Sequence, residues 1–336
     1  MKTKRVLVLG GTRFVGRHIV EAVVEAGHPV TLFNRGQTDP AIFTELEFIK
    51  GDRDGGLAGL AGGSWDVVID VNGYLPGIVR QSTDLLKHAV EQYIFISTLS
   101  VYRPPFPTGG DESAALEKVQ DETSEDIQTY YGALKALCEK AVRDDLPDQH
   151  LILRLGLMAG PYDPTDRATY WIWRANQPGR IALPAGPSTT YQFLDARDLA
   201  QFVLLTIEKR VTGIYNTAGE TGRWSDLLEA ARSVTDIENT AVWIEDETFL
   251  AKYEPAEPRP SGFFPMRLPP DAGNYWSISS HKARSIGLET RPLRETVESL
   301  YSWMLAREPE YKWQAGLTEK QEAELISAWE EMNVED

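Results

Sequence analysis

Short runs of β-branched and aliphatic residues recur along the first half of the chain. Most are followed by a glycine or an aspartate, and several lead into an amphipathic stretch. Apolar runs of this length, bounded by turn-forming residues, predict buried strands. The predicted strands cover 6–9, 29–33, 46–49, 67–71, 93–96 and 151–153, with a further strand at 213–216.

Helical spacing is clearest directly after the first strand. Val15, Ile19 and Val23 lie on one face of a helix that ends at Gly27. Strands that alternate with helices predict an α/β fold, a Rossmann-type doubly wound parallel sheet with a smaller C-terminal substrate lobe. Further helices are predicted over 195–207, 224–234 and 318–331.

The texture of the chain changes after Pro161, where aromatic residues and prolines become frequent. The change predicts a dinucleotide-binding domain followed by an irregular lobe and an acidic tail. The predicted domains are a Rossmann domain at 1–160 to which 190–219 returns, a substrate-binding lobe at 161–189 and 220–310, and an acidic C-terminal helix at 311–336.

Composition disfavours several classes of function. The 336 residues carry 34 Lys and Arg against 50 Asp and Glu, a net charge of −16, which disfavours binding to nucleic acid or anionic lipid. A single cysteine, Cys138, and five scattered histidines predict neither a disulfide nor a metal site. With no apolar run of about 18 residues, we expect a cytoplasmic protein with no membrane segment.

Glycines follow the first strand at the point where a phosphate-binding turn is found in dinucleotide-binding folds. A strand, a glycine-rich turn and a helix N-terminus together favour a pyrophosphate site, although such a turn can also serve only to reverse the chain. The expected cofactor contacts here are Gly10, Thr12, Arg13, Phe14, Val15 and Gly16.

The end of the second strand bears on the choice of dinucleotide. An NAD site usually has a carboxylate there, whereas this chain has Asn34 and Arg35. A 2′-phosphate would meet the guanidinium groups of Arg13 and Arg35, so we expect NADP(H) to be preferred, with NAD(H) as the alternative. Asp52 and Arg53 follow the third strand, where Asp52 would accept from the adenine amine or cap a turn. The alternative for Arg35 is a solvated turn residue with no contact to the cofactor.

Tyr131 and Lys135 are four residues apart on a predicted helix, which makes them neighbours on one face. A tyrosine must lose roughly three pKa units, about 4 kcal/mol, to exchange protons at neutral pH. One cation about 4 Å away supplies roughly that much at an effective dielectric constant near 20. Thr98, at the end of a strand, would orient the substrate oxygen, or would bond only to the backbone.

These motifs occur in an order that resembles a known family. Residues 10–16, 97–102, 131–135 and 154–161 together resemble the extended short-chain dehydrogenase/reductases, the NAD-dependent epimerase/dehydratase group. The resemblance implies that Tyr131 is the general acid/base, that Lys135 binds the nicotinamide ribose and lowers the pKa of the tyrosine, and that Thr98 binds the reacting oxygen. It also implies a homodimer, and contacts with the cofactor from Val71, Asn72, Gly73, Gly156, Leu157 and Met158.

The chain departs from the sugar-nucleotide members of that family at three places. Leu99-Ser100 stands where dehydratases have Asp-Glu, Leu157 where an Asn lies near the substrate diphosphate, and Tyr191 where an Arg is common. We therefore expect an NAD(P)-dependent oxidoreductase that transfers hydride to or from a smaller carbonyl or alcohol. Expected substrate contacts are Tyr74, Ser100 and Arg167, the last of which would otherwise pair with Asp166.

Two other functions stay open at this point. One is a nucleotide-sugar epimerase that keeps NAD tightly bound through its cycle. The other is a non-catalytic, cofactor-responsive RNA-binding protein, because the chain also resembles the chloroplast stem-loop-binding relatives within the group. Thr98, Tyr131 and Lys135 favour an enzyme over the RNA-binding alternative.

Overall fold

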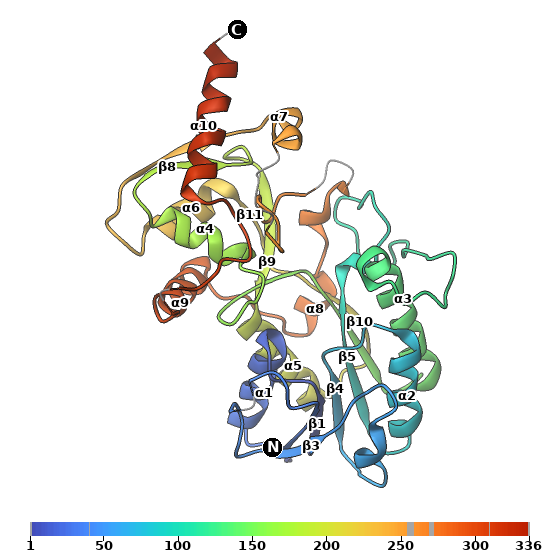
Figure 1. Cartoon of the computed structure of the whole chain (residues 1–336). Coiled ribbons are helices and arrows are strands. Elements are labelled where there is room, and N and C mark those ends of the chain that lie inside the picture. The colour runs from blue at the N-terminus through green and yellow to red at the C-terminus, as the bar shows by residue number, and fades with distance from the viewer. Residues whose placement is uncertain (1, 40, 254–258, 269–271, 309, 335–336) are drawn as a thin grey trace. The chain divides into compact units, whose positions relative to one another are not determined.

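The computed structural model describes residues 2–39, 41–253, 259–268, 272–308 and 310–334 (Figure 1). The chain folds into two compact units, each described here by itself. Unit 1 consists of Met1–Met158, Leu194–Gly219 and Gly273–Thr290, and unit 2 consists of Ala159–Phe193, Glu220–Ala272 and Arg291–Asp336.

Unit 1 is built on a parallel sheet of seven strands in the order β10-β6-β5-β4-β1-β2-β3. This arrangement confirms the predicted Rossmann-type fold. Its elements are β1 (Val6–Leu9), α1 (Phe14–Glu25), β2 (Val30–Asn34), β3 (Glu47–Lys50), η1 (Leu57–Leu60), β4 (Val67–Asp70), α2 (Pro76–Leu86), β5 (Gln92–Thr98), η2 (Leu99–Val101), α3 (Ile127–Asp145), β6 (His150–Leu155), α5 (Ala196–Lys209), β10 (Gly213–Thr217), η4 (Tyr275–Ser277) and α8 (His281–Ile286).

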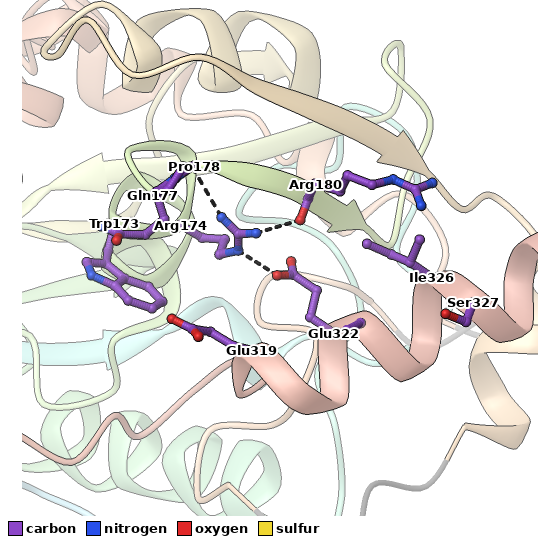
Figure 2. A pocket seen from close by; sticks show the side chains of 10 residues that line it. Trp173, Arg174, Gln177, Pro178, Arg180, Glu319, Glu322, Ile326 and Ser327 are labelled. Carbon is purple, nitrogen blue, oxygen red and sulfur yellow. Dashed lines mark hydrogen bonds and ion pairs between the residues drawn. The ribbon is translucent and has the colours of Figure 1, made fainter.

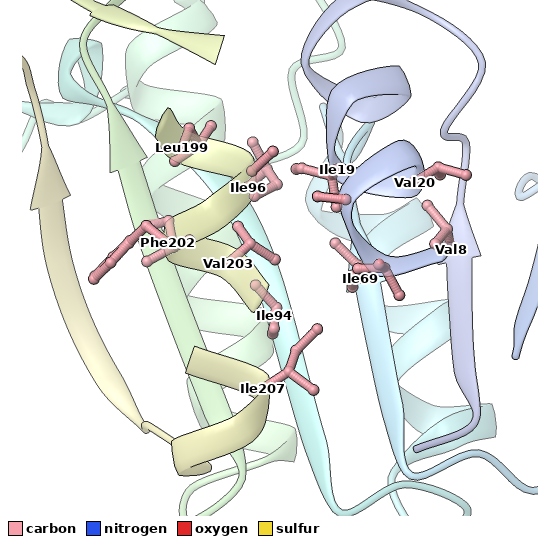
Figure 3. Packing of buried hydrophobic residues seen from close by; sticks show 14 of the residues in the cluster. Val8, Ile19, Val20, Ile69, Ile94, Ile96, Leu199, Phe202, Val203 and Ile207 are labelled. Atoms are coloured by element: carbon pink, nitrogen blue, oxygen red, sulfur yellow. The ribbon is translucent and has the colours of Figure 1, made fainter. Parts of the chain in front are cut away.

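Alternating residues of each central strand pack into two separate cores because successive side chains point to opposite faces of a sheet. In β1, Val6 and Val8 belong to the core that α1 and α5 cover, and Leu7 and Leu9 to the core that α2 and α3 cover. Figure 3 shows Ile19 of α1 and Val203 of α5 packed over the first face. Both faces are therefore buried, as the nearly continuous apolar strands require.

Strand β3 departs from the prediction of a buried strand. It lies at the edge of the sheet, pairs only with β2, and leaves Phe48 48% exposed. Residues 273–290 also differ from the prediction that placed them in the lobe. They fold with unit 1, where the Ser280 hydroxyl donates to the carbonyl of Ala218 over 2.8 Å.

Unit 2 contains more regular structure than its prolines suggested. Trp171 of α4 and Trp224 of α6 form an edge-to-face ring pair at 5.0 Å in its interior. Its elements are α4 (Arg167–Ala175), β8 (Gly179–Leu183), β11 (Thr221–Arg223), α6 (Trp224–Arg232), β12 (Asn239–Trp243), α7 (Glu247–Lys252), α9 (Leu293–Leu305) and α10 (Glu319–Val334), while β7 (Leu157–Ala159) and β9 (Thr190–Asp195) cross the limits of the units.

Helix α10 is part of unit 2 and not a separate C-terminal element, because it buries Leu325 and Ile326 against the core around β8. Glu322 on this helix forms a buried ion pair with Arg174 of α4 at 2.6 Å. These two residues border an open pocket of about 500 Å³ (Figure 2). A second arginine at that pocket, Arg180, pairs with Glu330.

Candidate active site

The turn after β1 has the shape that a phosphate-binding loop requires. Gly10 and Gly11 both adopt positive φ, at 107° and 91°, and a Cβ at Gly10 would lie 2.7 Å from Val71 Cγ2. Arg13, the N-cap residue of α1, makes no side-chain capping bond. The turn thus combines close backbone packing with a helix N-terminus that suits an anion, and it fits the pyrophosphate of a dinucleotide.

The end of β2 braces this turn. The Asn34 amide donates to the Gly10 carbonyl over 3.2 Å and accepts from the Gly36 N–H over 2.8 Å. Its side chain therefore shapes the loop. Arg35 is exposed, and its guanidinium lies 4.0 Å from the exposed carboxylate of Asp52. A pair as open to water as this one is weak, so the Arg35 side chain can reorient toward a ligand. The Asp52 carboxylate also accepts from the Asp54 N–H over 3.1 Å and thus caps a turn.

Close backbone packing seats the N-terminal half of α3 against η2, which directly follows β5. A Cβ at Gly132 would lie 2.0 Å from the Ser100 carbonyl oxygen, so only glycine permits this approach. Tyr130, just before the contact, has non-helical angles of φ −113° and ψ 25°. Together these features fix the direction in which the Tyr131 side chain projects from α3.

Lys135 is buried one helical turn further along α3. Its ammonium donates to the carbonyls of Gly73 over 2.8 Å and Ile96 over 2.7 Å, and it lies 4.1 Å from the ring centre of Phe95. An ammonium has three N–H donors, so one remains after these two bonds. Burial lowers the pKa of Lys135 to about 8, although nearby anions such as Asp70 oppose the shift. The group is therefore still protonated at neutral pH.

Tyr131, Tyr74 and Thr98 are the other expected reactive groups. Tyr131 is 36% exposed, and its ring centre is 6.4 Å from that of Tyr74, which is itself 5.6 Å from the Lys135 ammonium. Burial raises the pKa of Tyr74, so its phenol stays neutral. The Thr98 hydroxyl oxygen accepts from the Ser100 N–H over 3.1 Å, a backbone bond that leaves the hydroxyl proton to donate elsewhere.

A buried polar network behind α3 was not identified from the sequence. Glu139 accepts from Arg154 of β6 and, over 2.6 Å, from the Ser97 hydroxyl of β5. Arg154 also donates to the Tyr102 hydroxyl over 2.8 Å. The network ties the helix of Tyr131 to the ends of two strands. A signal was present, because Glu139 follows Lys135 by four residues on the same helical stripe.

Arg53 is a buried arginine whose partner was not identified from the sequence. Its guanidinium is turned inward, where it pairs with both oxygens of Asp70 at 2.6 and 2.7 Å. The side chain is 8% exposed, and its contact with a cofactor stays a prediction. The signal for this pair was Asp70 itself, a charged residue at the end of an otherwise apolar strand.

Three more of the expected cofactor contacts are apolar side chains of unit 1. Val71 packs on Gly10, while Leu157 and Met158 are each 5% exposed, with Met158 packed into the first core of unit 1. In unit 2, Arg167 donates to the Thr165 hydroxyl over 3.0 Å. The alternative pairing of Arg167 with Asp166 is wrong, because Asp166 instead pairs with Arg307 at 2.6 Å.

The described residues contain no group of three or more His, Cys, Asp or Glu side chains arranged to hold a metal ion. Within the same part of the chain, no helix is both long enough and apolar enough to cross a membrane.

Fold and site together define a dinucleotide-binding protein of the Rossmann class. The model of the NAD dependent epimerase/dehydratase family matches residues 6–59 and 77–218, more than half of the chain, and the chain belongs to this family. It is thus an enzyme of an NAD-dependent family, as the resemblance of its motifs implied.

Three known proteins illustrate the similarity. The chain is 28% identical over 238 residues to the chloroplast stem-loop binding protein of 41 kDa b of Arabidopsis thaliana, a match over 65% of this chain and 59% of that one. It is 29% identical over 224 residues to the 2-alkyl-3-oxoalkanoate reductase of Stenotrophomonas maltophilia, over 59% and 64%. These matches span about three fifths of each relative's length.

A solved structure, the UDP-glucuronic acid 4-epimerase of Bacillus cereus in complex with NAD, has the same fold. It superposes with a TM-score of 0.61 at 17% identity and covers 90% of this chain and 99% of that one. At this identity the likeness concerns the fold alone.

Proposed function

We propose that the protein is an NAD(P)-dependent oxidoreductase that interconverts a small carbonyl compound and its alcohol. The observation that carries the proposal is the buried Lys135 ammonium, held by two backbone carbonyls at the carboxyl edge of the sheet, one helical turn from Tyr131. Such a cation stabilises a phenolate more than a phenol. Proton exchange at the Tyr131 hydroxyl is the chemistry that this arrangement supports best.

Each residue has a separate part in the proposed reaction. When bound, a nicotinamide cofactor supplies hydride exchange with the substrate carbon. In the reducing direction the Tyr131 hydroxyl gives its proton to the substrate oxygen, and in the oxidising direction the phenolate takes it back. The Thr98 hydroxyl donates a hydrogen bond to the same oxygen, and the Lys135 ammonium holds the phenolate state at lower energy. Tyr74 and Ser100 border the substrate.

The decisive variant is Tyr131→Phe, with Tyr130→Phe as its matched control. Both phenols are exposed and adjacent on α3, but only Tyr131 is assigned the proton. We expect Tyr131→Phe to lose at least about 10²-fold in kcat while binding the dinucleotide normally, and Tyr130→Phe to stay near wild type. Turnover is followed by NADPH oxidation with a panel of small ketones that includes 2-alkyl-3-oxoalkanoates. Equal turnover of the two variants would refute the mechanism.

The preference for NADP(H) is proposed on the exposed guanidinium groups of Arg13 and Arg35. The neutral amide of Asn34 does not repel a 2′-phosphate. The carboxylate of Asp52, 4.0 Å from Arg35, does repel it, so the charge of Arg35 is the one to test. The substitution Arg35→Ala is expected to weaken NADPH binding by about 10-fold and to leave NADH binding nearly unchanged. Fluorescence titration measures both affinities. Equal affinity of the wild type for both cofactors would count against the preference.

A nucleotide-sugar epimerase is the second candidate, because the Bacillus cereus structure with the same fold is one. An epimerase of that type would purify with bound dinucleotide and turn over UDP-sugars with none added. The reductase among the relatives favours the smaller substrate.

RNA binding, suggested by the stem-loop binding relative, is opposed by the charge of −16. A salt-dependent mobility shift of short RNA hairpins by the protein would support RNA binding.

We expect the protein to be a homodimer, which native mass spectrometry would check.

A further inference from the structure

Arg53 joins three segments that surround the proposed dinucleotide site. It follows β3, and its guanidinium donates to Asp70 at the end of β4, to the Asn72 side chain over 3.1 Å and to the Ser82 hydroxyl of α2 over 3.2 Å. The Asn72 side chain in turn packs beside the phosphate-loop glycine, Gly10. One buried side chain therefore links the loops after β3 and β4 with the glycine turn.

Asp70 is a buried carboxylate close to the proposed proton-transfer lysine. It is fully buried and accepts from Arg53, from the Tyr93 hydroxyl over 2.9 Å and from the Asn72 N–H. Three residues further on, the Gly73 carbonyl accepts from the Lys135 ammonium. The Gly73 backbone is so close that a Cβ there would lie 3.3 Å from the Asp70 carboxylate.

A buried carboxylate beside a buried ammonium normally forms an ion pair with it, because neither charge is stable in a low dielectric without a partner. Here the fork of Arg53 takes both carboxylate oxygens, a geometry that Lys135 cannot match. Lys135 is left with uncharged acceptors, the carbonyls of Gly73 and Ile96. Neutral acceptors leave the positive charge uncompensated at the site.

We propose that Arg53 is a positioning residue that neutralises Asp70 and so prevents Lys135 from forming an ion pair with that carboxylate. The inference rests on the proposed function, in which an uncompensated Lys135 cation stabilises the Tyr131 phenolate. It assigns the Arg53–Asp70 pair to the electrostatics of the proton-transfer group and not to stability alone.

Other charged and titratable groups near Lys135 must be included in the argument. Glu139 and Cys138 lie on its own helix, and Glu139 is already paired with Arg154 and bonded to Ser97. Burial and the neighbouring Asp70 raise the pKa of Cys138 to about 12, so it is neutral at physiological pH. The phenols of Tyr74 and Tyr93 have raised pKa values and are also neutral. Removal of Arg53 or Asp70 is thus the cleanest way to change the charge near Lys135.

The test measures the titration of Lys135 in protein free of cofactor and substrate. The ¹³Cε resonances of labelled lysine are followed against pH, and Lys135→Met identifies the relevant signal. Arg53→Met removes a cation and is expected to raise the midpoint by about one pH unit or more, whereas Asp70→Asn removes an anion and is expected to lower it by a similar amount. The uncharged double variant should return toward the wild-type value, which is about 8.

Two further variants separate charge from packing. Arg53→Lys keeps the charge, so the midpoint is expected to stay within a few tenths of a pH unit of wild type. Arg174→Met breaks the buried pair with Glu322 in unit 2 and is expected to lower stability with no change in the Lys135 midpoint.

If Arg53→Met does not fold, Asp70→Asn and the double variant decide the outcome. Shifts in the same direction for both single variants, or no shift, would overturn the proposal. Because no turnover is measured, the result does not depend on the outcome of Tyr131→Phe.

Discussion

Replacement of Gly132 by alanine tests whether the seat of α3 fixes the reactive geometry. The added Cβ would lie 2.0 Å from the Ser100 carbonyl oxygen, a backbone atom that cannot rotate away. Helix and loop must separate by about 1.5 Å to reach an ordinary contact of about 3.5 Å. Alanine favours a helix by up to about 1 kcal/mol over glycine, whereas overpacking costs about 1–3 kcal/mol. The net loss of stability is therefore small, about 2 kcal/mol at most.

The effect on catalysis is expected to be larger than the effect on stability. A misplacement of about 1 Å of the groups on α3 relative to Thr98 reduces kcat/KM by about 10²-fold, or about 2.7 kcal/mol in the transition state. Steady-state kinetics and urea unfolding of the same preparation measure both quantities. Gly77→Ala is the control, because a Cβ at this α2 position meets no atom within 4 Å. A Gly132→Ala protein with kcat/KM within threefold of wild type would refute the reasoning.

Three more predictions concern buried groups. Because burial lowers the pKa of Lys135 to about 8, its charge costs stability at pH 7, whereas Lys135→Met removes that charge and leaves the carbonyls of Gly73 and Ile96 without their donor. The free energy of unfolding of the wild type should therefore rise relative to that of Lys135→Met as pH rises from 8 toward 10.5, because the folded lysine loses its proton before the unfolded one does; a constant difference in urea titrations would contradict this. Cys138 is fully buried, so iodoacetamide at pH 8 should label it only in urea, and labelling of native protein would count against its position. Glu322→Gln removes the carboxylate that pairs with Arg174 and should cost about 3–5 kcal/mol in urea unfolding, with little effect on NADPH affinity.

Much of unit 1 was predictable because its signals are local. The apolar run at 6–9 is β1, and the glycine turn after it leads into α1 as expected. The exposed edge position of β3 was not predictable, since a short apolar run reads the same whether one or two neighbours pair with it. The regular structure of the lobe was missed for a related reason. Its prolines indicate turns and its tryptophans indicate large buried side chains, but neither tells which segments pack together.

The amino-acid sequence by itself determined where strands and glycine turns occur along the chain and that Tyr131 and Lys135 share one face of a helix. Dihedral preference and helical period act over a few residues, so these features can be predicted locally. Pairings such as Arg53 with Asp70, Glu139 with Arg154 and Asp166 with Arg307 were decided by the tertiary structure. A charged side chain chooses its partner by distance in space and by the cost of burial. Both quantities are defined only once segments from distant parts of the chain lie side by side.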